Sequence, residues 1–206
     1  MDEKSLIAAL PGVSALRFYQ QTGSTNDDAL AWIAQGAPDF SIIVAEHQTA
    51  GRGRMQRRWI TPSGAALAFS LILRPQPEET SRLSFFSALG AVALGDILSQ
   101  DYGLESEIKW PNDLLLARRK TAGILAEAAW QGRKPFAVVI GIGVNVAPES
   151  VPGEETLSFP ATCIEQHVGS KIDRLELLAR LVDRMRLLRP STGSPAFIQT
   201  WRERLA

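Results

Sequence analysis

The sequence is poor in the residues that build disulfides, metal centres and nucleic-acid surfaces. It contains one cysteine, Cys163, and two histidines, His47 and His167, which lie far apart in the chain. A single cysteine forms no internal disulfide, and histidines so widely separated do not have zinc-ligand spacing. Lysine and arginine together number 22 and the acids also number 22, so no net charge attracts the chain to nucleic acid or to a membrane surface. We therefore expect a cytoplasmic protein with no nucleic-acid partner.

Long hydrophobic runs are missing as well. The apolar run 6–10 ends at Pro11 and is too short for the core of a signal peptide or for a membrane span, so no membrane partner is expected. The residues before about 22 are too few for a three-helix DNA-binding domain. A chain of 206 residues can bury one core without disulfides, and no repeat or linker divides it, so residues 1–206 are predicted to form a single domain.

Short β-branched runs and helical periodicities alternate along the chain. Strands are expected at 15–19, 41–45, 66–73, 104–110, 114–117, 121–130 and 136–146, and helices at 26–35, 78–100, 174–188 and from 195 to the end. The strands of the middle third follow one another closely and are expected to be antiparallel neighbours. The fold class is therefore α+β, with helices packed on a mixed, largely antiparallel sheet.

The most unusual stretch runs from Gly51 to Trp59 and holds four arginines and two glycines within nine residues. Glycine lets the backbone turn and lets a ligand approach it closely, while arginine supplies planar donors for phosphate or carboxylate. This composition is typical of a loop that closes over an anion, and a solvated basic turn is the alternative. Strands are predicted on both sides of the loop.

Polar residues also gather where a helix begins and a strand ends. Ser24, Thr25 and Asn26 precede helical periodicity, where they are typical N-cap residues and where free N–H groups also suit a polar ligand. Gln48 follows a buried strand, and its amide can both donate and accept. Such residues favour recognition of an amide-like ligand, with helix capping as the simpler interpretation.

A predicted hairpin carries a second polar group. Lys109 and Lys120 lie on opposite arms of this hairpin and can face one pocket. Asp113 beside them can hold Mg²⁺ through one carboxylate, and cations around a triphosphate provide the charge neutralisation that attack at phosphorus requires. The alternatives are a turn cap for Asp113 and a solvated hairpin tip for Lys120.

Together these segments strongly resemble the biotin protein ligase family. The matching motifs in chain order are Ser24-Thr25-Asn26, the glycine-arginine loop, Lys109-Trp110-Pro111-Asn112-Asp113, Lys120-Thr121-Ala122-Gly123-Ile124-Leu125 and Gly141-Ile142-Gly143-Val144-Asn145. The resemblance covers residues from about 22 to 146 and, more loosely, the closing helices. It implies a catalytic domain like that of class II aminoacyl-tRNA synthetases. It also implies adenylation of biotin by ATP and Mg²⁺ to biotinyl-5′-AMP, then transfer of biotin to a lysine of a biotin carboxyl carrier protein or domain.

The resemblance further implies roles for individual residues. Catalysis is assigned to Lys120, Arg54 and Lys109. Substrate binding is assigned to Ser24, Thr25, Asn26, Gln48, Gly51, Arg52, Gly53, Arg54, Lys120 and Gly123. Nucleotide binding is assigned to Arg57, Trp59, Lys109, Asn112, Ile124 and Asn145, and the metal to Asp113, with Phe159 matched loosely to an aromatic over the adenine. A core anchor for the end of the loop explains Trp59 equally well.

Three features depart from the family pattern. Gln56 stands where the loop of the family has a third glycine, and a positive φ there would cost roughly 1 kcal/mol. The absence of a DNA-binding domain before residue 22 argues against a repressor role. The chain stops at Ala206, about where relatives continue into a small β-barrel domain, so the protein is either minimal or shortened.

Several alternatives stay open. A lipoate or octanoate protein ligase or transferase shares this fold and an essential lysine but generally lacks the glycine-arginine loop, and a biotin sensor would bind without catalysis. Family members often dimerise along a sheet edge, which makes a homodimer a further expectation. Because the loop arginines have no acidic partner within their own segment, we predict that the loop is mobile without ligand.

Overall fold

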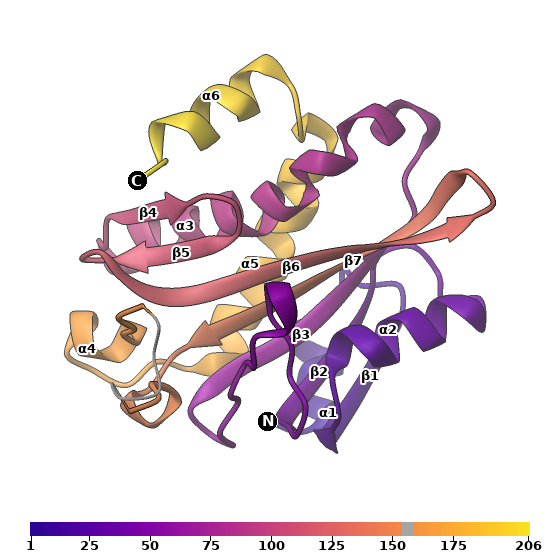
Figure 1. The fold of residues 1–206 in the computed structure, drawn as a ribbon. Helices are drawn as coiled ribbons and strands as arrows, with labels where there is room; N and C mark the ends of the chain where they lie inside the picture. Colours follow the sequence, from indigo (N-terminus) through magenta and orange to yellow (C-terminus); the bar gives the residue numbers. More distant parts are fainter. Residues whose placement is uncertain (154–158) are drawn as a thin grey trace.

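A seven-stranded sheet forms the frame of the protein in the computed structural model, which describes residues 1–153 and 159–206 (Figure 1). The strand order is β1-β2-β3-β7-β6-β5-β4. The strands are β1 (Leu16–Thr22), β2 (Ser41–Gln48), β3 (Ala66–Leu73), β4 (Ser106–Lys109), β5 (Asp113–Leu116), β6 (Arg119–Gln131) and β7 (Lys134–Asn145). β1 and β2 are parallel, and the other neighbouring pairs are antiparallel, which confirms the predicted mixed sheet.

Helices cover both faces of the sheet. They are α1 (Glu3–Ala9), α2 (Thr25–Ala34), α3 (Phe86–Tyr102), α4 (Ile164–Val168), α5 (Arg174–Leu188) and α6 (Pro195–Glu203). Figure 1 shows α3 and α5 behind the sheet and α2 in front of it. Successive strand residues point to opposite faces, so Ile42 and Val44 join the large core around α3, while Ile43 packs beneath α2.

The central helix α3 begins later than the sequence predicted. Residues Pro77–Phe85 form a 3-10 segment, in which Glu79 accepts a hydrogen bond from the Gln76 backbone N–H and is held by two more from Arg189. The α-helix therefore starts at Phe86 rather than near residue 78. The segment Pro77–Tyr102 is long and apolar enough to match a membrane span, but α3 is buried against the sheet and α5 as a core helix.

Other boundaries also differ from the predictions, and two of them affect the polar residues. β2 continues to Gln48, past the predicted end at residue 45, so Gln48 belongs to the sheet. The tight turn after β5 lies at Ala117 and Arg118, which adopt φ of 46° and 62°. Lys120 therefore belongs to β6 and is not a solvated hairpin tip. The five-residue helix α4 was not predicted, because a single helical turn carries little periodicity.

Glu46 near the end of β2 ties the sheet to α5. It is 7% exposed, and its Oε1 atom accepts hydrogen bonds from the Gly64 backbone N–H and the Arg174 guanidinium, both at 2.7 Å. Burial alone would raise the pKa of this carboxyl, but the hydrogen bonds from Arg174 and Gly64 outweigh it and hold the pKa below the ordinary 4.5. Because the pKa is lower in the folded state than in the unfolded state, the ionised carboxylate stabilises the fold at pH values above the ordinary pKa of 4.5. This stabilisation is lost as the pH falls through the folded-state pKa.

We therefore predict that Glu46→Gln lowers the free energy of unfolding by about 2 kcal/mol at pH 7, since hydrogen bonds to charged groups contribute at this level. The difference from wild type should shrink as the pH falls below the ordinary value of 4.5. Urea denaturation at neutral and acidic pH measures both effects. Asp183→Asn is the control, because it breaks an exposed pair with Arg186 and should cost less than about 0.5 kcal/mol. Equal stability of Glu46→Gln and wild type at pH 7 would contradict the prediction.

Candidate active site

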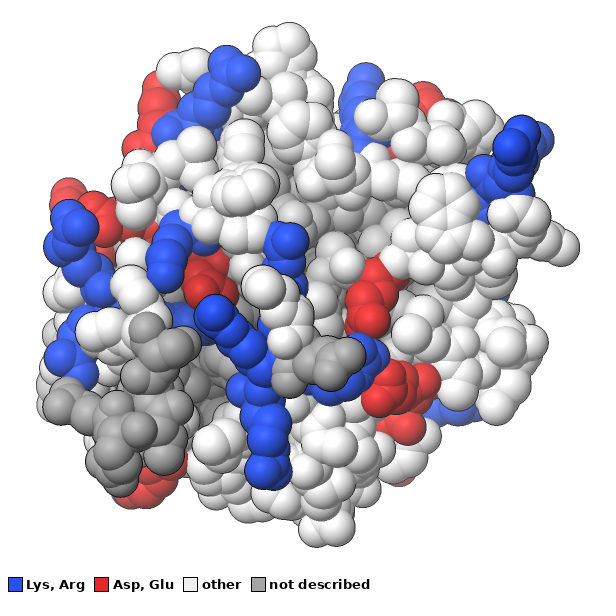
Figure 2. Space-filling view, viewed as in Figure 1, with Lys and Arg blue, Asp and Glu red and all other residues white. Residues whose placement is uncertain are grey.

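A cavity of about 830 Å³ opens on the face of the sheet that carries α2. Its walls come from the start of α2, the loop between β2 and β3, the turn before β5, and strands β6 and β7. All the residues assigned by resemblance line this cavity except Gly51. Figure 2 shows Lys and Arg side chains gathered near the middle of this face. Segments from distant parts of the chain thus meet in one cavity.

Gln48 organises the floor of the cavity. Its Oε1 atom accepts a hydrogen bond from the Thr25 backbone N–H at 2.9 Å, and its Nε2 atom donates to Thr61 Oγ1 at 3.1 Å. Ser24 occupies the N-cap position of α2, but its side chain makes no cap hydrogen bond. Ser24 is therefore the N-cap residue by position, as predicted, while Gln48 from β2 accepts the hydrogen bond from the first N–H group of the helix. Thr61 was not predicted from the sequence as a site residue.

At two glycines of β7, side chains from other parts of the chain pack directly against the strand backbone. A Cβ atom at Gly141 would lie 2.0 Å from Asn26 Oδ1, and one at Gly143 would lie 2.2 Å from Trp59 Cε2. The missing side chains at these glycines therefore let Asn26 and Trp59 approach the backbone of β7 closely. The buried Nε1 atom of Trp59 has no hydrogen-bond partner among the described residues, which leaves a donor in the cavity wall. Trp59 is thus both the packed anchor of the loop and a lining residue.

The basic loop is closed at its base by backbone hydrogen bonds. Trp59 N donates to Gly51 O at 2.8 Å, and Gly53 N donates to Arg57 O at 2.7 Å. A Cβ at Gly51 would lie 2.5 Å from Trp59 O, so this glycine is required for the closure. A positive φ of 55° falls on Met55, the residue before Gln56, whose side chain lies outside those that the structure describes.

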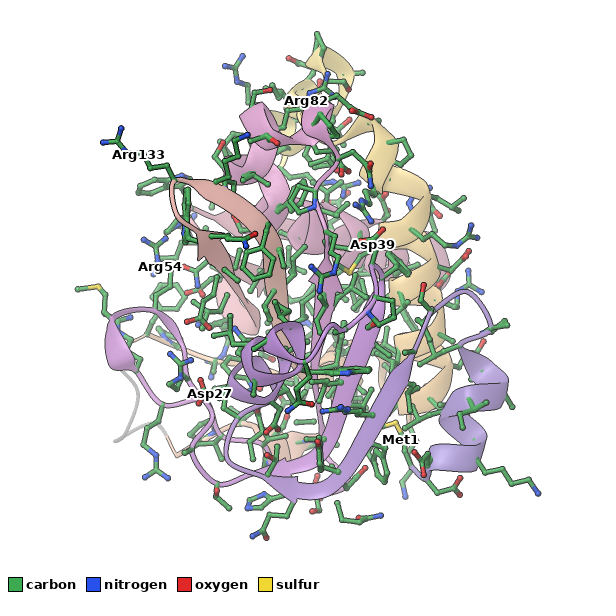
Figure 3. All side chains as sticks on the ribbon, turned by 90° about the vertical axis from the view of Figure 1, so that its right-hand side faces the viewer. Met1, Asp27, Asp39, Arg54, Arg82 and Arg133 are labelled. Carbon is green, nitrogen blue, oxygen red and sulfur yellow. The ribbon has the colours of Figure 1, made fainter. Side chains whose placement is uncertain are left out.

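Arg52 attaches the loop to the rest of the protein. Its guanidinium lies 2.5 Å from Asp27 of α2 and 3.4 Å from Glu127 of β6. Figure 3 labels Asp27 and Arg54 and shows the loop beside the start of α2. Loop arginines lack acidic partners within their own segment, but Arg52 finds two outside it. The predicted mobility of the loop therefore stays a prediction, with Arg52 as a point of attachment that the sequence did not reveal.

Lys109 ends β4 and Lys120 lies in β6, so the two lysines face the cavity from strands separated by β5 and not from the two arms of one hairpin. Lys120 Nζ lies 2.7 Å from Asp113 Oδ1, as an ion pair without the directional geometry of a hydrogen bond. The Lys120 backbone is fixed on its other side, because its N–H donates to Pro160 O and its carbonyl accepts from Thr162 N. Lys109 Nζ lies 3.5 Å from the ring centroid of Phe159, a cation–π contact. The arrangement can place two ammonium groups around an anionic ligand.

A metal ion near the two lysines would have few side-chain ligands. In residues 1–153 and 159–206, no group of three or more His, Cys, Asp or Glu side chains could hold a metal ion. A divalent ion would have to rely on Asp113 together with oxygen atoms of a ligand. Asn145 Nδ2 donates to Thr162 O at 3.1 Å, and Asn112 O accepts from Ile124 N, so both residues also have structural contacts.

Ser70 and Glu127, two polar residues that were not predicted from the sequence as site residues, lie under the cavity floor. Ser70 Oγ contacts Thr25 Oγ1 at 2.8 Å and Asn26 Oδ1 at 2.6 Å, and Asn26 Nδ2 donates to Glu127 Oε2 at 2.6 Å. A signal was present, since Ser70 is the only polar residue of the apolar strand Ala66–Leu73. Such a residue needs a partner when it is buried.

An α+β domain with a hydrogen-bonding floor and a cationic wall in one cavity has the features of a domain that binds a small anionic molecule. The chain belongs to the Biotin/lipoate A/B protein ligase family, whose profile matches residues 18–145. The biotin--[acetyl-CoA-carboxylase] ligase of Mycobacterium tuberculosis is 38% identical over 195 residues, covering 88% of this chain and 71% of that protein. The bifunctional ligase/repressor BirA of Bacillus subtilis is 36% identical, covering 81% of this chain and 51% of that protein. This chain thus spans about half the length of the BirA relatives from the two Bacillus species, 51% and 50%.

Solved structures resemble the fold over nearly the whole chain. The biotin protein ligase of Aquifex aeolicus, in complex with biotin and ATP, has a TM-score of 0.78 and 25% identity, covering 93% of this chain and 78% of that one. The Leishmania major biotin protein ligase, in complex with biotinyl-5-AMP, has a TM-score of 0.75 at 22% identity and supports the fold alone. The predicted fold class, that of biotin protein ligase catalytic domains, is confirmed.

The contact between Gly143 and Trp59 yields a stability prediction. Gly143→Ala should lower the free energy of unfolding by about 1–3 kcal/mol, because the new methyl group displaces the indole ring. In a Trp59→Ala background the same substitution should cost little, since the space is then open. Urea denaturation of the four proteins of this double-mutant cycle measures the coupling.

Gly23→Ala serves as the control for the glycine substitution, because no atom lies within 4 Å of a Cβ placed there. Its cost should stay below about 0.5 kcal/mol. A cost for Gly143→Ala that persists unchanged without the Trp59 ring would show that the indole is not the cause.

Proposed function

We propose that this chain carries the catalytic activity of a biotin protein ligase. It would use ATP to convert biotin to biotinyl-5′-AMP and then transfer the biotinyl group to a lysine of a biotin carboxyl carrier domain. One observation carries the proposal: a floor of amide and hydroxyl groups and a wall of ammonium and guanidinium groups share one cavity. The floor suits the neutral cyclic urea of biotin, and the wall suits a carboxylate beside a triphosphate.

In the first step, an oxygen of the biotin carboxylate attacks the α-phosphorus of ATP. A new O–P bond forms, the bond to the β-phosphate oxygen breaks, and pyrophosphate leaves with its negative charge. Both reactants are anions, so the reaction needs cations that neutralise them together. Lys120 with Arg54 would neutralise the reacting carboxylate and α-phosphate, and Lys109 with Arg57 the remaining phosphates.

In the second step, the neutral amine of the carrier lysine attacks the carbonyl carbon of the mixed anhydride. An amide bond forms, AMP leaves, and the amine loses its extra proton to solvent. Until that attack the anhydride must be protected from water, which a loop closed over the cavity provides. The attachment of Arg52 to Asp27 and Glu127 supports such a role for the basic loop.

Mg²⁺ is part of the proposal, and the residues present fit it. The buried Oδ1 atom of Asp113 has no hydrogen-bond partner among the described residues, although Lys120 lies beside it as an ion pair. A single carboxylate combined with phosphate oxygens is a common magnesium environment in nucleotide enzymes. When bound, the ion would offset phosphate charge, and Asp113 would orient it.

The relatives support biotin as the acyl substrate, because their names specify biotin ligation. The family also includes lipoate ligases, so lipoate and octanoate are the competing substrates. We also propose a cytoplasmic location and, along a sheet edge, a homodimer.

Biotin-dependent exchange of labelled pyrophosphate into ATP tests the proposal. The wild-type protein should catalyse exchange with biotin and not with lipoate or octanoate. Lys120→Ala should reduce exchange at least about 100-fold, because it removes a charge that stabilises the reacting phosphate. Lys134→Ala is a matched control on the same pair of strands, at the exposed start of β7 and outside the cavity lining, and should leave the rate unchanged.

The outcomes separate the alternatives. Exchange with lipoate or octanoate in place of biotin would identify a different member of the family. No exchange with any acid at saturating ATP, despite binding of biotin, would contradict the ligase and support a sensor. Addition of a biotin carboxyl carrier domain, with mass spectrometry of its lysine, then tests the second step.

A further inference from the structure

Ser70 lies beneath the cavity floor and links two floor residues. The side chain is fully buried on β3, and its Oγ atom lies 2.8 Å from Thr25 Oγ1 and 2.6 Å from Asn26 Oδ1. A hydroxyl group has one proton to donate, so it can serve as donor in only one of these two contacts. The direction of each hydrogen bond therefore depends on its neighbours.

Glu127 sets the orientation of the Asn26 amide. Asn26 Nδ2 lies 2.6 Å from Glu127 Oε2 and 3.4 Å from Leu125 O, and both of these oxygens are acceptors. A flipped amide would direct the Asn26 oxygen at a carboxylate and at a carbonyl, with no proton between them. The amide oxygen must therefore face Ser70, and because an amide oxygen only accepts, Ser70 must donate its proton to Asn26.

The same reasoning fixes the proton of Thr25. Since the Ser70 proton is used for Asn26, the 2.8 Å contact is satisfied only if Thr25 donates to Ser70. The other neighbour of the Thr25 hydroxyl is Gln48 Oε1 at 3.2 Å, which already accepts the Thr25 backbone N–H at 2.9 Å. Ser70 is the nearer acceptor and Gln48 Oε1 is already engaged, so Ser70 holds the Thr25 proton inside the protein, and Thr25 offers lone pairs to the cavity.

We infer that Glu127, Asn26 and Ser70 form a one-way hydrogen-bond relay that makes Thr25 an obligatory acceptor, and that this relay sets the specificity of the cavity for an acyl substrate with an N–H donor. The inference rests on the proposed function and deepens it. A cyclic urea carries two ring N–H donors, whereas a dithiolane ring or an alkyl chain carries none. A substrate without the donor would leave a buried acceptor unpaired, which typically weakens binding about 10- to 100-fold.

Ser70 and Glu127 act in this scheme as positioning residues, because neither needs to touch the substrate. Ser70 is absent from the cavity lining, and Glu127 reaches the floor through Asn26. Glu127 also pairs with Arg52, so the end of the relay contacts the attachment point of the basic loop. The packing of Asn26 against Gly141 keeps the amide within reach of both partners.

Titration calorimetry with biotin and two analogues tests the relay. Each analogue replaces one ring N–H of the urea with a ring oxygen, so shape is preserved while one donor is lost. For the wild-type protein, one of the two analogues should bind about 10- to 100-fold more weakly than biotin. In Ser70→Ala, the Thr25 proton is free to rotate toward the ligand, and this ratio should fall at least about 5-fold, even if both affinities decrease.

Two further variants guard against a purely structural effect. Ser41→Ala removes another fully buried sheet hydroxyl, which donates to Pro38 O outside the cavity, and should leave the ratio at its wild-type value. Thr25→Ser retains the hydroxyl and should also retain the ratio. A general loss of packing would change affinities without changing the preference between biotin and its analogue.

The relay is overturned if the ratio is the same in Ser70→Ala and in wild type, or if the wild-type protein binds both analogues as tightly as biotin. Failure of the proposed function looks different, since a protein that binds biotin without pyrophosphate exchange would contradict the ligase and leave the ratio test of the relay intact. A wild-type protein that binds neither biotin nor the analogues would overturn the inference as well. A selective change in Ser70→Ala alone supports the relay.

Discussion

The absence of side chains at Gly141 and Gly143 is the constraint on which the site depends. Asn26 and Trp59 lie so close to the backbone of β7 that a Cβ at either glycine would overlap them. Because the strand surface is bare there, Asn26 can reach Ser70 and Glu127 beneath the floor. Trp59 can hold one end of the basic loop through its backbone bond to Gly51. The cavity therefore depends on two positions of a central strand that carry no side chain.

Charge is distributed unequally around this cavity. Arg52 is engaged by Asp27 and Glu127, whereas Arg54 and Arg57 line the cavity without an ion pair in the part of the chain that the structure describes. One arginine thus attaches the loop, and others are available for an anionic ligand. In the same cavity, Lys120 is held by Asp113 and by the backbone of residues 160–162. Such fixed cations need little rearrangement when a polyanion binds, which is the basis of electrostatic catalysis.

Much of the fold followed from local signals. The bounds of β3 and α5 agree with the predicted ranges 66–73 and 174–188, because both segments have strong periodicity and clear ends. The start of α3 was misplaced, since Arg189 holds Glu79 from 110 positions away and no local pattern reports that contact. Likewise, Lys120 was placed correctly in the cavity by its motif, while its position inside β6 rather than at a hairpin tip depended on the turn at Ala117 and Arg118.

By itself, the sequence determined the α+β class, the main strands and helices, and the motif residues that meet in the cavity. Periodicity, turn residues and short motifs act over a few positions, so they can be read from a single chain. Only the tertiary structure decided that Gln48 caps α2, that Arg52 pairs with Asp27, and that Ser70 and Glu127 orient the floor. Partners such as Asn26 and Glu127 are 101 positions apart, and the fold alone brings them within 2.6 Å. This contact sets the direction of each hydrogen bond in the relay, and with it the inferred preference of the cavity for a substrate with an N–H donor.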